Sequence, residues 1–235
     1  MGAPGVRARV RAELTREIAE VARRHLASDG AAGLSLRAVA RELGMASSAV
    51  YRYFPSRDDL LTALIVDAYN AMGEAAEAAD AEHARGDLLG RWQAACAAVR
   101  AWALAHPHEY ALVYGSPVPG YAAPEATIGP AGRVGVVLCR VVADGVTSGA
   151  LDDTSDGSGL DATIQPGLAA ELGLPADPTG SVAARAVHAW TSLFGLINFE
   201  LFGHTHNVVV DDEAFFAAST ARLAAGFGVV DAAAR

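Results

Sequence analysis

One stretch near the start of the chain, residues 35–57, restricts the possible folds more than any other part. Ser35 is placed to cap a helix, because its hydroxyl can accept a backbone N–H of the first turn. Gly44 stands where a helix can end in the left-handed conformation that glycine adopts at little cost. A three-residue turn and a second cap at Ser47 follow, so the pattern predicts a helix-turn-helix. Its inward positions are Leu36, Val39, Ala40 and Leu43 in one helix and Val50 and Phe54 in the next.

The expected helix after the turn carries polar chemistry on its outer face. Ser47, Ser48, Tyr51 and Arg52 share one side of this helix, opposite Val50. Hydroxyl groups suit phosphate oxygens, and Arg52 can pair with guanine O6 and N7 in the major groove. Two aromatic side chains on the outside of so short a helix need a partner. A plain three-helix bundle with a polar surface is the alternative.

Residues 35–57 resemble the signature of the TetR family of transcriptional repressors, in which a capped helix, a glycine turn and a short helix ending in aromatic-x-aromatic-Phe precede a serine and a basic residue. Here the last positions are Tyr51, Arg52, Tyr53, Phe54, Ser56 and Arg57, with Arg57 in place of the usual lysine. The resemblance implies phosphate contacts from Ser35, Tyr51, Tyr53 and Arg57, and base contacts from the region of Ser47, Ser48 and Arg52. Arg37 completes the set of expected DNA-binding residues.

Charge is distributed unevenly along the chain. The net charge is −9, yet residues 1–60 carry +3 and the remaining residues −12. A basic head on an acidic body is typical of a DNA-binding protein with a separate regulatory part, although a chance fluctuation explains so small an excess as well. Arg7, Arg9 and Arg11 precede the first amphipathic helix, which is expected over 10–26, and form a short basic arm. Such an arm can reach DNA or simply be solvated.

Helical periodicity continues through most of the chain and predicts an all-α protein. A long helix is expected from about Arg57 to about Ala79, and the charged stretch 80–87 follows it. We therefore expect a helix-turn-helix DNA-binding domain over 1–56, a connecting helix over 57–80, and a larger helical ligand-binding and dimerisation domain over 81–235. Residues 133–149 are expected to be helical, with a short valine-rich strand as the alternative.

Aromatic residues gather in the first part of the expected body. A helix over 88–106, a short helix opened by Pro107 and a proline-rich loop over 115–130 carry them. A tyrosine-bearing loop beside a tryptophan-bearing helix is a reasonable wall for an apolar ligand, although plain core is the common alternative. The candidate ligand-binding residues are Trp92, Cys96, Trp102, Tyr110, Tyr114 and Tyr121.

Two apolar helices close the chain, one over 182–202 and one that contains Phe216, Leu223 and Phe227. In the TetR family such helices usually pair with their symmetry mates, which implies a homodimer, whereas a monomer core explains the apolarity equally well. The candidate interface residues are Trp190, Phe194, Ile197, Phe216 and Leu223. Residues 189–200 also resemble a motif of the WHG-type branch of TetR C-terminal domains, with Phe194 in place of the usual histidine.

Other chemistry is not expected. Cys96 and Cys139 lie in apolar surroundings, as buried free thiols do. The histidine pairs 106/108 and 204/206 are two residues apart and lack further ligands, and the Asp-rich stretch 152–159 lacks the last acidic ligand of a calcium loop, so neither metal nor cofactor is expected. There is no phosphate-binding glycine loop and no nucleophile elbow.

The sequence therefore predicts a cytoplasmic, non-enzymatic regulator, because it shows neither a signal peptide nor an apolar run of about 18 residues. Its expected partners are double-stranded DNA with a palindromic operator, a second copy of itself and a small, largely apolar effector that releases it from DNA. No membrane partner is expected. The alternatives are a small all-helical enzyme with a helix-turn-helix-like head and a sequence-independent DNA-binding protein.

Overall fold

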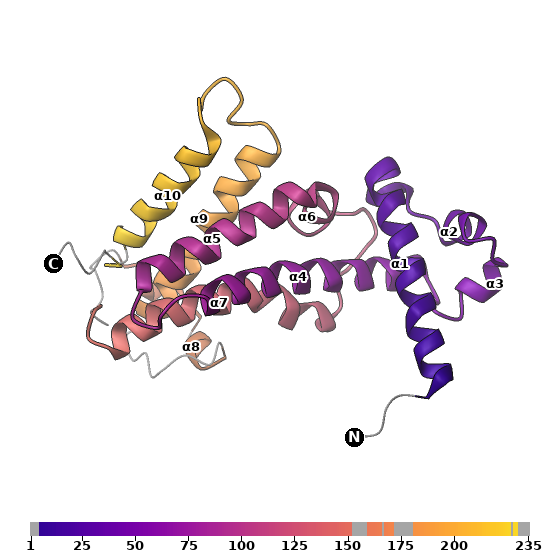
Figure 1. Cartoon of the computed structure of the whole chain (residues 1–235), viewed down its shortest axis with the longest axis horizontal. Helices are drawn as coiled ribbons and strands as arrows, with labels where there is room; N and C mark the ends of the chain where they lie inside the picture. The colour runs from indigo at the N-terminus through magenta and orange to yellow at the C-terminus, as the bar shows by residue number, and fades with distance from the viewer. Residues whose placement is uncertain (1–4, 152–158, 166, 172–180, 227, 230–235) are drawn as a thin grey trace. The chain divides into compact units, whose positions relative to one another are not determined.

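The computed structural model describes residues 5–151, 159–165, 167–171, 181–226 and 228–229. These residues form helices, turns and loops without any strand, so the expected all-α class is confirmed and the strand alternative for 133–149 is excluded. The helices, labelled in Figure 1, are α1 (Val6–Gly33), α2 (Leu36–Glu42), α3 (Ser47–Val50), α4 (Arg57–Ala81), α5 (Leu88–Ala105), α6 (Pro107–Tyr114), α7 (Ile128–Thr147), α8 (Leu168–Glu171), α9 (Ser181–Leu201) and α10 (Asp212–Gly226), with short 3₁₀ turns at Glu125–Thr127 and Asp161–Thr163.

The chain forms two compact units. The head unit comprises Met1–Tyr69 and His106–Ile128, and the body unit comprises Asn70–Ala105 and Gly129–Arg235. The expected boundaries place 106–128 in the body, but in the structure this segment packs with the head, where α6 lies against α1. The sequence pattern gives no hint of this return, because it depends on a contact between residues about 90 positions apart.

The head is built around one apolar core. Ile18 of α1, Val39 of α2, Val50 of α3 and Leu60 of α4 are all buried in it. The α1 helix bends at Gly30, which has φ +69°, and continues to Gly33, beyond the expected range of 10–26. It also begins earlier than expected, at Val6, so the three arginines of the predicted basic arm lie on a helix.

Helix ends in the head follow local sequence signals. Gly44 has φ +65°, and the N–H groups of Gly44 and Met45 donate to carbonyls of α2 at 3.2 and 2.9 Å, as glycine helix ends require. The Ser56 hydroxyl accepts the N–H of Asp59 at 3.0 Å and donates to its carboxylate at 2.7 Å, so Ser56 caps α4.

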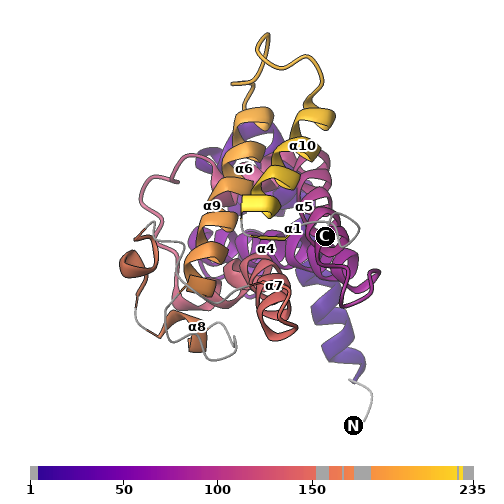
Figure 2. The ribbon, with the colours of Figure 1, turned by 90° about the vertical axis from the view of Figure 1, so that its left-hand side faces the viewer.

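The body packs α5 against both α9 and α10, and α9 and α10 run side by side (Figure 2). Trp92 of α5 is fully buried, and its indole N–H donates to the carbonyl of Thr220 in α10 at 2.9 Å. Arg100 of α5 forms a two-pronged ion pair with Glu200 of α9, at 2.7 and 2.6 Å. These contacts tie three helices together through buried and half-buried groups.

The α7 helix is apolar enough to need a separate explanation. By length and composition, Glu125–Thr147 could cross a membrane, but 44% of the tested stretch is buried inside the protein. Within the body, Arg133 of α7 forms a two-pronged ion pair with Glu77 of α4, at 3.0 and 2.7 Å, and lowers the pKa of that carboxyl. Such burial and pairing are typical of a core helix.

Candidate DNA-binding surface and body groove

The α2–α3 pair has the geometry of a helix-turn-helix. The two helices pack against each other, and three turn residues follow Leu43 between them (Figure 1). The α3 helix has only four residues, after which the N–H groups of Arg52 and Tyr53 donate to carbonyls three residues back. The helical course therefore continues to Tyr53 as a tighter turn, close to the extent expected from the sequence.

The expected DNA-binding side chains all belong to α2, α3 and the segments beside them. Ser48, Tyr51 and Arg52 are exposed on α3 and its continuing turn, and Arg37 is exposed on α2. Tyr51 exposes 41% of its surface although it is a large aromatic residue. Ser35, Ser47, Tyr53 and Arg57 are half-buried. The exposed group offers one aromatic hydroxyl, one aliphatic hydroxyl and two guanidinium groups for contact with a ligand.

Two serine caps expected from the sequence are not formed. Ser35 has the extended backbone of a cap residue, but its hydroxyl makes no cap hydrogen bond. The cap position of α3 is taken by Ala46, so Ser47 is the first helical residue. Because neither hydroxyl caps a helix, both keep their hydrogen-bonding capacity for another partner.

Arg57 has a role inside the head that the sequence did not reveal. Its guanidinium donates to the carbonyls of Ala31 at 2.7 Å and Leu34 at 3.2 Å, at the end of α1. The Ala31 carbonyl lies in the last turn of α1 and the Leu34 carbonyl just past it, where helix carbonyls lack regular internal donors. Arg57 therefore joins the start of α4 to the end of α1, and less of its donor capacity is left for a phosphate than expected.

Arg11 is a second arginine that makes contacts within the head, although it is exposed. Its guanidinium donates to the carbonyl of Arg52 at 3.2 Å and lies over the ring of Tyr53, 5.2 Å from the centroid. On the other side of the head, Glu42 of α2 accepts hydrogen bonds from Arg24 at 2.7 Å and from the ring of His25 at 2.6 Å. These contacts fix α2 and the end of α3 to α1.

The six expected ligand-binding residues are divided between the two units. Trp92, Cys96 and Trp102 lie on α5 in the body, where all three are buried. Trp92 and Cys96 have no exposed surface at all, so both pack as core residues in this structure. The hydrogen bond between Trp92 and α10 explains the burial of Trp92, and a ligand-binding role for these three residues stays a prediction.

The three tyrosines of the expected set lie in the head unit. Tyr114 contacts the rings of Tyr110 at 5.3 Å and Tyr69 at 5.9 Å, and the Tyr121 hydroxyl is 2.9 Å from that of Thr62. Burial raises the pKa of Tyr110, and burial followed by the neighbouring Tyr121 raises that of Tyr69. Tyr110 and Tyr69 therefore stay neutral, and the four tyrosines join α4, α6 and the loop after α6.

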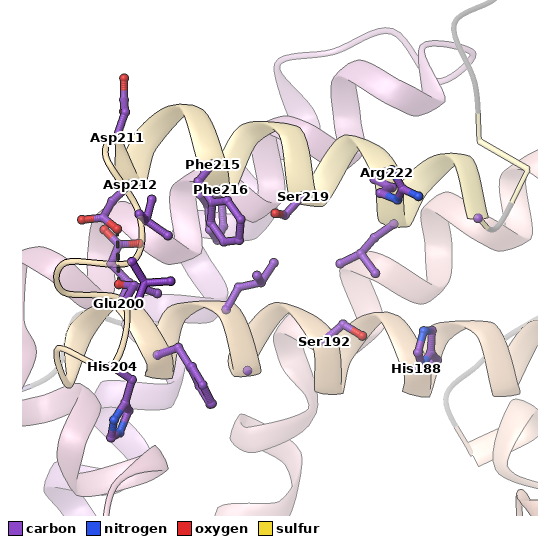
Figure 3. Close-up of a pocket in the computed structure, with 18 of the residues that line it drawn as sticks. His188, Ser192, Glu200, His204, Asp211, Asp212, Phe215, Phe216, Ser219 and Arg222 are labelled. Carbon is purple, nitrogen blue, oxygen red and sulfur yellow. Dashed lines mark hydrogen bonds between the residues drawn. The ribbon is translucent and has the colours of Figure 1, made fainter.

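A groove of about 1490 Å³ lies along α9 and α10 in the body (Figure 3). Its apolar lining includes Phe199, Phe215 and Leu223, and Phe199 exposes 59% of its surface. Of the labelled side chains, Glu200, His204, Asp211 and Asp212 lie at one end, and His188 and Arg222 at the other. None of the six expected ligand-binding residues lines this groove.

The expected interface residues fall on both sides of the α9–α10 pair. Phe194, Ile197 and Phe216 are largely buried within the single chain, although Phe216 also lines the groove, so their place at an interface stays a prediction. Trp190 is 36% exposed and Leu223 half-buried, so both reach the surface. Phe227 and the Asp-rich stretch 152–158 lie outside the described residues.

The cysteines and the possible metal ligands among the described residues do not form a functional site. Cys96 and Cys139 are free and buried as expected, and burial raises the pKa of Cys139 to about 12 and that of Cys96 further still. Both thiols are therefore protonated and unreactive near neutral pH. Among the residues that the structure describes, no three His, Cys, Asp or Glu side chains form a group that could hold a metal ion.

The head and its exposed α3 surface define a helix-turn-helix protein, and comparisons identify its family. Residues 18–64 match the family described as bacterial regulatory proteins, tetR family, and residues 92–223 match the Tetracyclin repressor-like, C-terminal domain. The chain belongs to the TetR family of transcriptional regulators. The resemblance of residues 189–200 to the WHG-type branch stays a prediction.

Relatives match along nearly the whole chain. HTH-type transcriptional regulator Rv1816 of Mycobacterium tuberculosis is 39% identical, over 94% of this chain and 95% of the relative, and regulator Mb1846 of Mycobacterium bovis matches equally well. A crystal structure of SCO4313, described as a regulatory protein, has a TM-score of 0.76 at 35% identity and covers 94% of this chain and 98% of that one. The similarity therefore includes both the head and the body.

Proposed function

We propose that this TetR-family regulator is a ligand-responsive repressor that binds a palindromic operator as a homodimer. The observation that carries the proposal is the exposed group Ser48, Tyr51 and Arg52 on a helix-turn-helix whose other face is buried. Arg52 suits bidentate pairing with guanine, and the hydroxyls of Ser48 and Tyr51 suit phosphate oxygens. Arg37, Ser35, Ser47 and Tyr53 extend this surface, and Arg57 contributes to it mainly by holding α4 in place.

A selection from random duplex DNA tests operator binding directly. The proposal predicts that the purified chain enriches a two-fold symmetric sequence whose half-sites are about one helical turn apart, since each copy presents one α3 to a major groove. Arg52→Ala, whose side chain makes no hydrogen bond or ion pair within the described residues, is expected to lose this enrichment without unfolding. Enrichment of a single asymmetric site, or of none, would contradict the proposal.

We assign the dimer surface to the groove of α9 and α10, with a second copy as its occupant. Exposed Phe199, Phe215 and Val208 line it, and apolar surface of this kind is typical of contacts between copies. Its two ends carry opposite charge, so an antiparallel copy brings Arg222 near the partner's acidic end. Trp190 and Leu223 lie on the same pair of helices and remain part of the proposed interface.

Sedimentation velocity tests this assignment. Phe199→Glu places a charge in the proposed contact and is expected to shift the chain from dimer to monomer. Val6→Glu is the matched control, because Val6 is an exposed apolar residue at the start of α1, outside the groove. If both variants sediment as the wild-type chain does, the interface lies elsewhere.

An effector is proposed because the body matches the Tetracyclin repressor-like C-terminal domain. The effector would favour a dimer geometry in which the two α3 helices no longer fit successive major grooves. A thermal-shift screen of small apolar compounds, repeated with operator DNA, is the test: an effector raises the melting temperature of the chain and weakens its DNA binding. We place this activity in the cytoplasm, where a bacterial operator is accessible.

A sequence-independent DNA-binding protein is the second candidate. The net positive charge of residues 1–60 favours it, because phosphate contacts alone supply non-specific affinity. It predicts binding that depends on salt but not on sequence, so the random-DNA selection separates the two proposals. The family comparisons give no support to the enzyme alternative, since they name regulators of transcription.

A further inference from the structure

The end of α3 is a weak point in the head. The helix has four residues, and such short helices are not stable alone because nucleation costs more than the few hydrogen bonds return. The carbonyl of Arg52 lies where the chain leaves the helical course, and the residue three positions later is Pro55, which has no N–H to donate. Something outside α3 must therefore hold the turn that carries Tyr51, Arg52 and Tyr53.

Arg11 supplies that support from α1. Its guanidinium donates to the Arg52 carbonyl at 3.2 Å and lies 5.2 Å from the centre of the Tyr53 ring. The Tyr53 ring also packs against the apolar core of the head, so both Arg11 and this core hold the ring in place. A cation at the end of a helical segment is favoured by the helix dipole as well.

Arg7 and Arg9 provide a comparison within the same helix. All three arginines are exposed, and Arg7 and Arg9 make no hydrogen bond, ion pair or ring contact with the part of the chain that the structure describes. The position of Arg11 is therefore distinguished by its contacts with α3 and not by charge or exposure. From the sequence, all three arginines appear as one basic arm with a single role.

We propose that Arg11 is a positioning residue for DNA reading, which sets the orientation of Arg52 and Tyr53 through the Arg52 carbonyl and the Tyr53 ring and does not itself bind phosphate. This inference rests on the proposed DNA-binding function. Arg11 thus determines specificity indirectly. Without it, the α3 turn samples more orientations, and the DNA contacts that require one geometry are weakened most.

The test compares Arg11→Ala with Arg9→Ala as matched control, on the selected operator and on a scrambled duplex over a range of salt concentrations. Arg11→Ala removes an exposed hydrogen bond and a cation–π contact in each chain of a dimer. We therefore expect the ratio of operator affinity to scrambled-duplex affinity to fall about tenfold. The slope of log affinity against log salt is expected to match wild type, whereas a lost phosphate contact lowers it by about 0.9 per chain. A lowered slope or an unchanged ratio would overturn the inference.

Arg11→Lys separates geometry from charge. Lysine keeps the positive charge but lacks the planar fork that contacts the carbonyl and the ring together, so it is expected to restore the affinity ratio only in part. Complete restoration by lysine would show that charge alone acts, which contradicts the proposal.

Amide hydrogen exchange on the DNA-free chain gives a readout that does not depend on the proposed function. The amides of Tyr53 and Phe54, which donate to the Val50 carbonyl, are expected to exchange several-fold faster in Arg11→Ala and at the wild-type rate in Arg9→Ala. Equal rates in all three chains would refute the positioning role. If instead wild type prefers no DNA sequence, the proposed function fails while the exchange result still decides the role of Arg11.

Discussion

Replacement of Arg91 by methionine is expected to cost about 3–4 kcal/mol of unfolding free energy, because it removes the buried cation that pairs with two half-buried carboxylates. Arg91 of α5 is fully buried. Its guanidinium donates to Asp80 at the end of α4 at 2.7 Å, to Asp144 of α7 at 2.8 Å, and to the carbonyl of Arg85 at 3.0 Å. Methionine fills similar space but satisfies none of these acceptors.

The magnitude follows from the exposure of the two carboxylates. The Asp80 side chain is 13% exposed and has Arg91 as its ion-pair partner, whereas Asp144 is 31% exposed and also pairs with Arg85 at 2.8 Å. Removing one partner of a buried pair typically costs about 3–5 kcal/mol, and the retained Arg85 contact places this case in the lower half of that range.

Urea unfolding followed by circular dichroism measures this loss. The control is Arg85→Ala, whose side chain is 69% exposed and whose loss is expected to cost less than about 1 kcal/mol. The double variant Arg91→Met with Asp80→Asn removes the stranded charge as well and is expected to recover part of the stability. A loss below about 1 kcal/mol for Arg91→Met, equal to that of the control, would refute the assignment of this cluster as a buried anchor of α4.

Three further changes test other parts of the structure. Arg52→Ala is expected to lower the operator-to-scrambled affinity ratio by roughly 5- to 150-fold per half-site in fluorescence anisotropy; equal weakening on both duplexes would rule out base contact. Trp92→Phe is expected to lower the unfolding free energy in urea by about 2–3 kcal/mol, because it loses the hydrogen bond to Thr220 and leaves a cavity. An unchanged unfolding free energy would favour a role for Trp92 in ligand contact. Hydrogen bonds from Arg24 and then His25 lower the pKa of Glu42, so its stabilisation is full above the ordinary glutamate pKa of about 4.3 and is lost as pH falls through the lowered value. Melting temperatures of wild type and Glu42→Gln should therefore differ at neutral pH and converge in acid; a difference that persists in acid would contradict this.

The helix-turn-helix could be predicted from the sequence because local signals determine it. Gly44 ends α2 with positive φ, Ser56 caps α4, and apolar spacing fixes the inward face. The predictions of caps at Ser35 and Ser47 were wrong for a physical reason. A serine favours a cap but does not force one, and the backbone around Ala46 adopts the cap geometry without a hydroxyl.

Contacts between distant parts of the chain were beyond the reach of periodicity. An apolar stripe shows that a helix has a buried face but not which partner covers it, so the stripe alone could not show that Phe194 and Phe216 are largely buried within the single chain. The same limit applies to arginines, whose charge suggests phosphate whatever their partners are. Arg57 donates to the end of α1 and Arg11 to the end of α3, and only the folded chain distinguishes them from Arg52, whose side chain makes no hydrogen bond or ion pair within the described residues.

The most direct test of the central claim is the mass of the complex between the chain and its selected operator, measured by native mass spectrometry. If a dimer presents its two α3 helices to the operator, two chains should bind each two-fold symmetric duplex. A duplex with only one half-site should be bound far more weakly. One chain per duplex, or a number of chains that grows with duplex length regardless of sequence, would contradict the account.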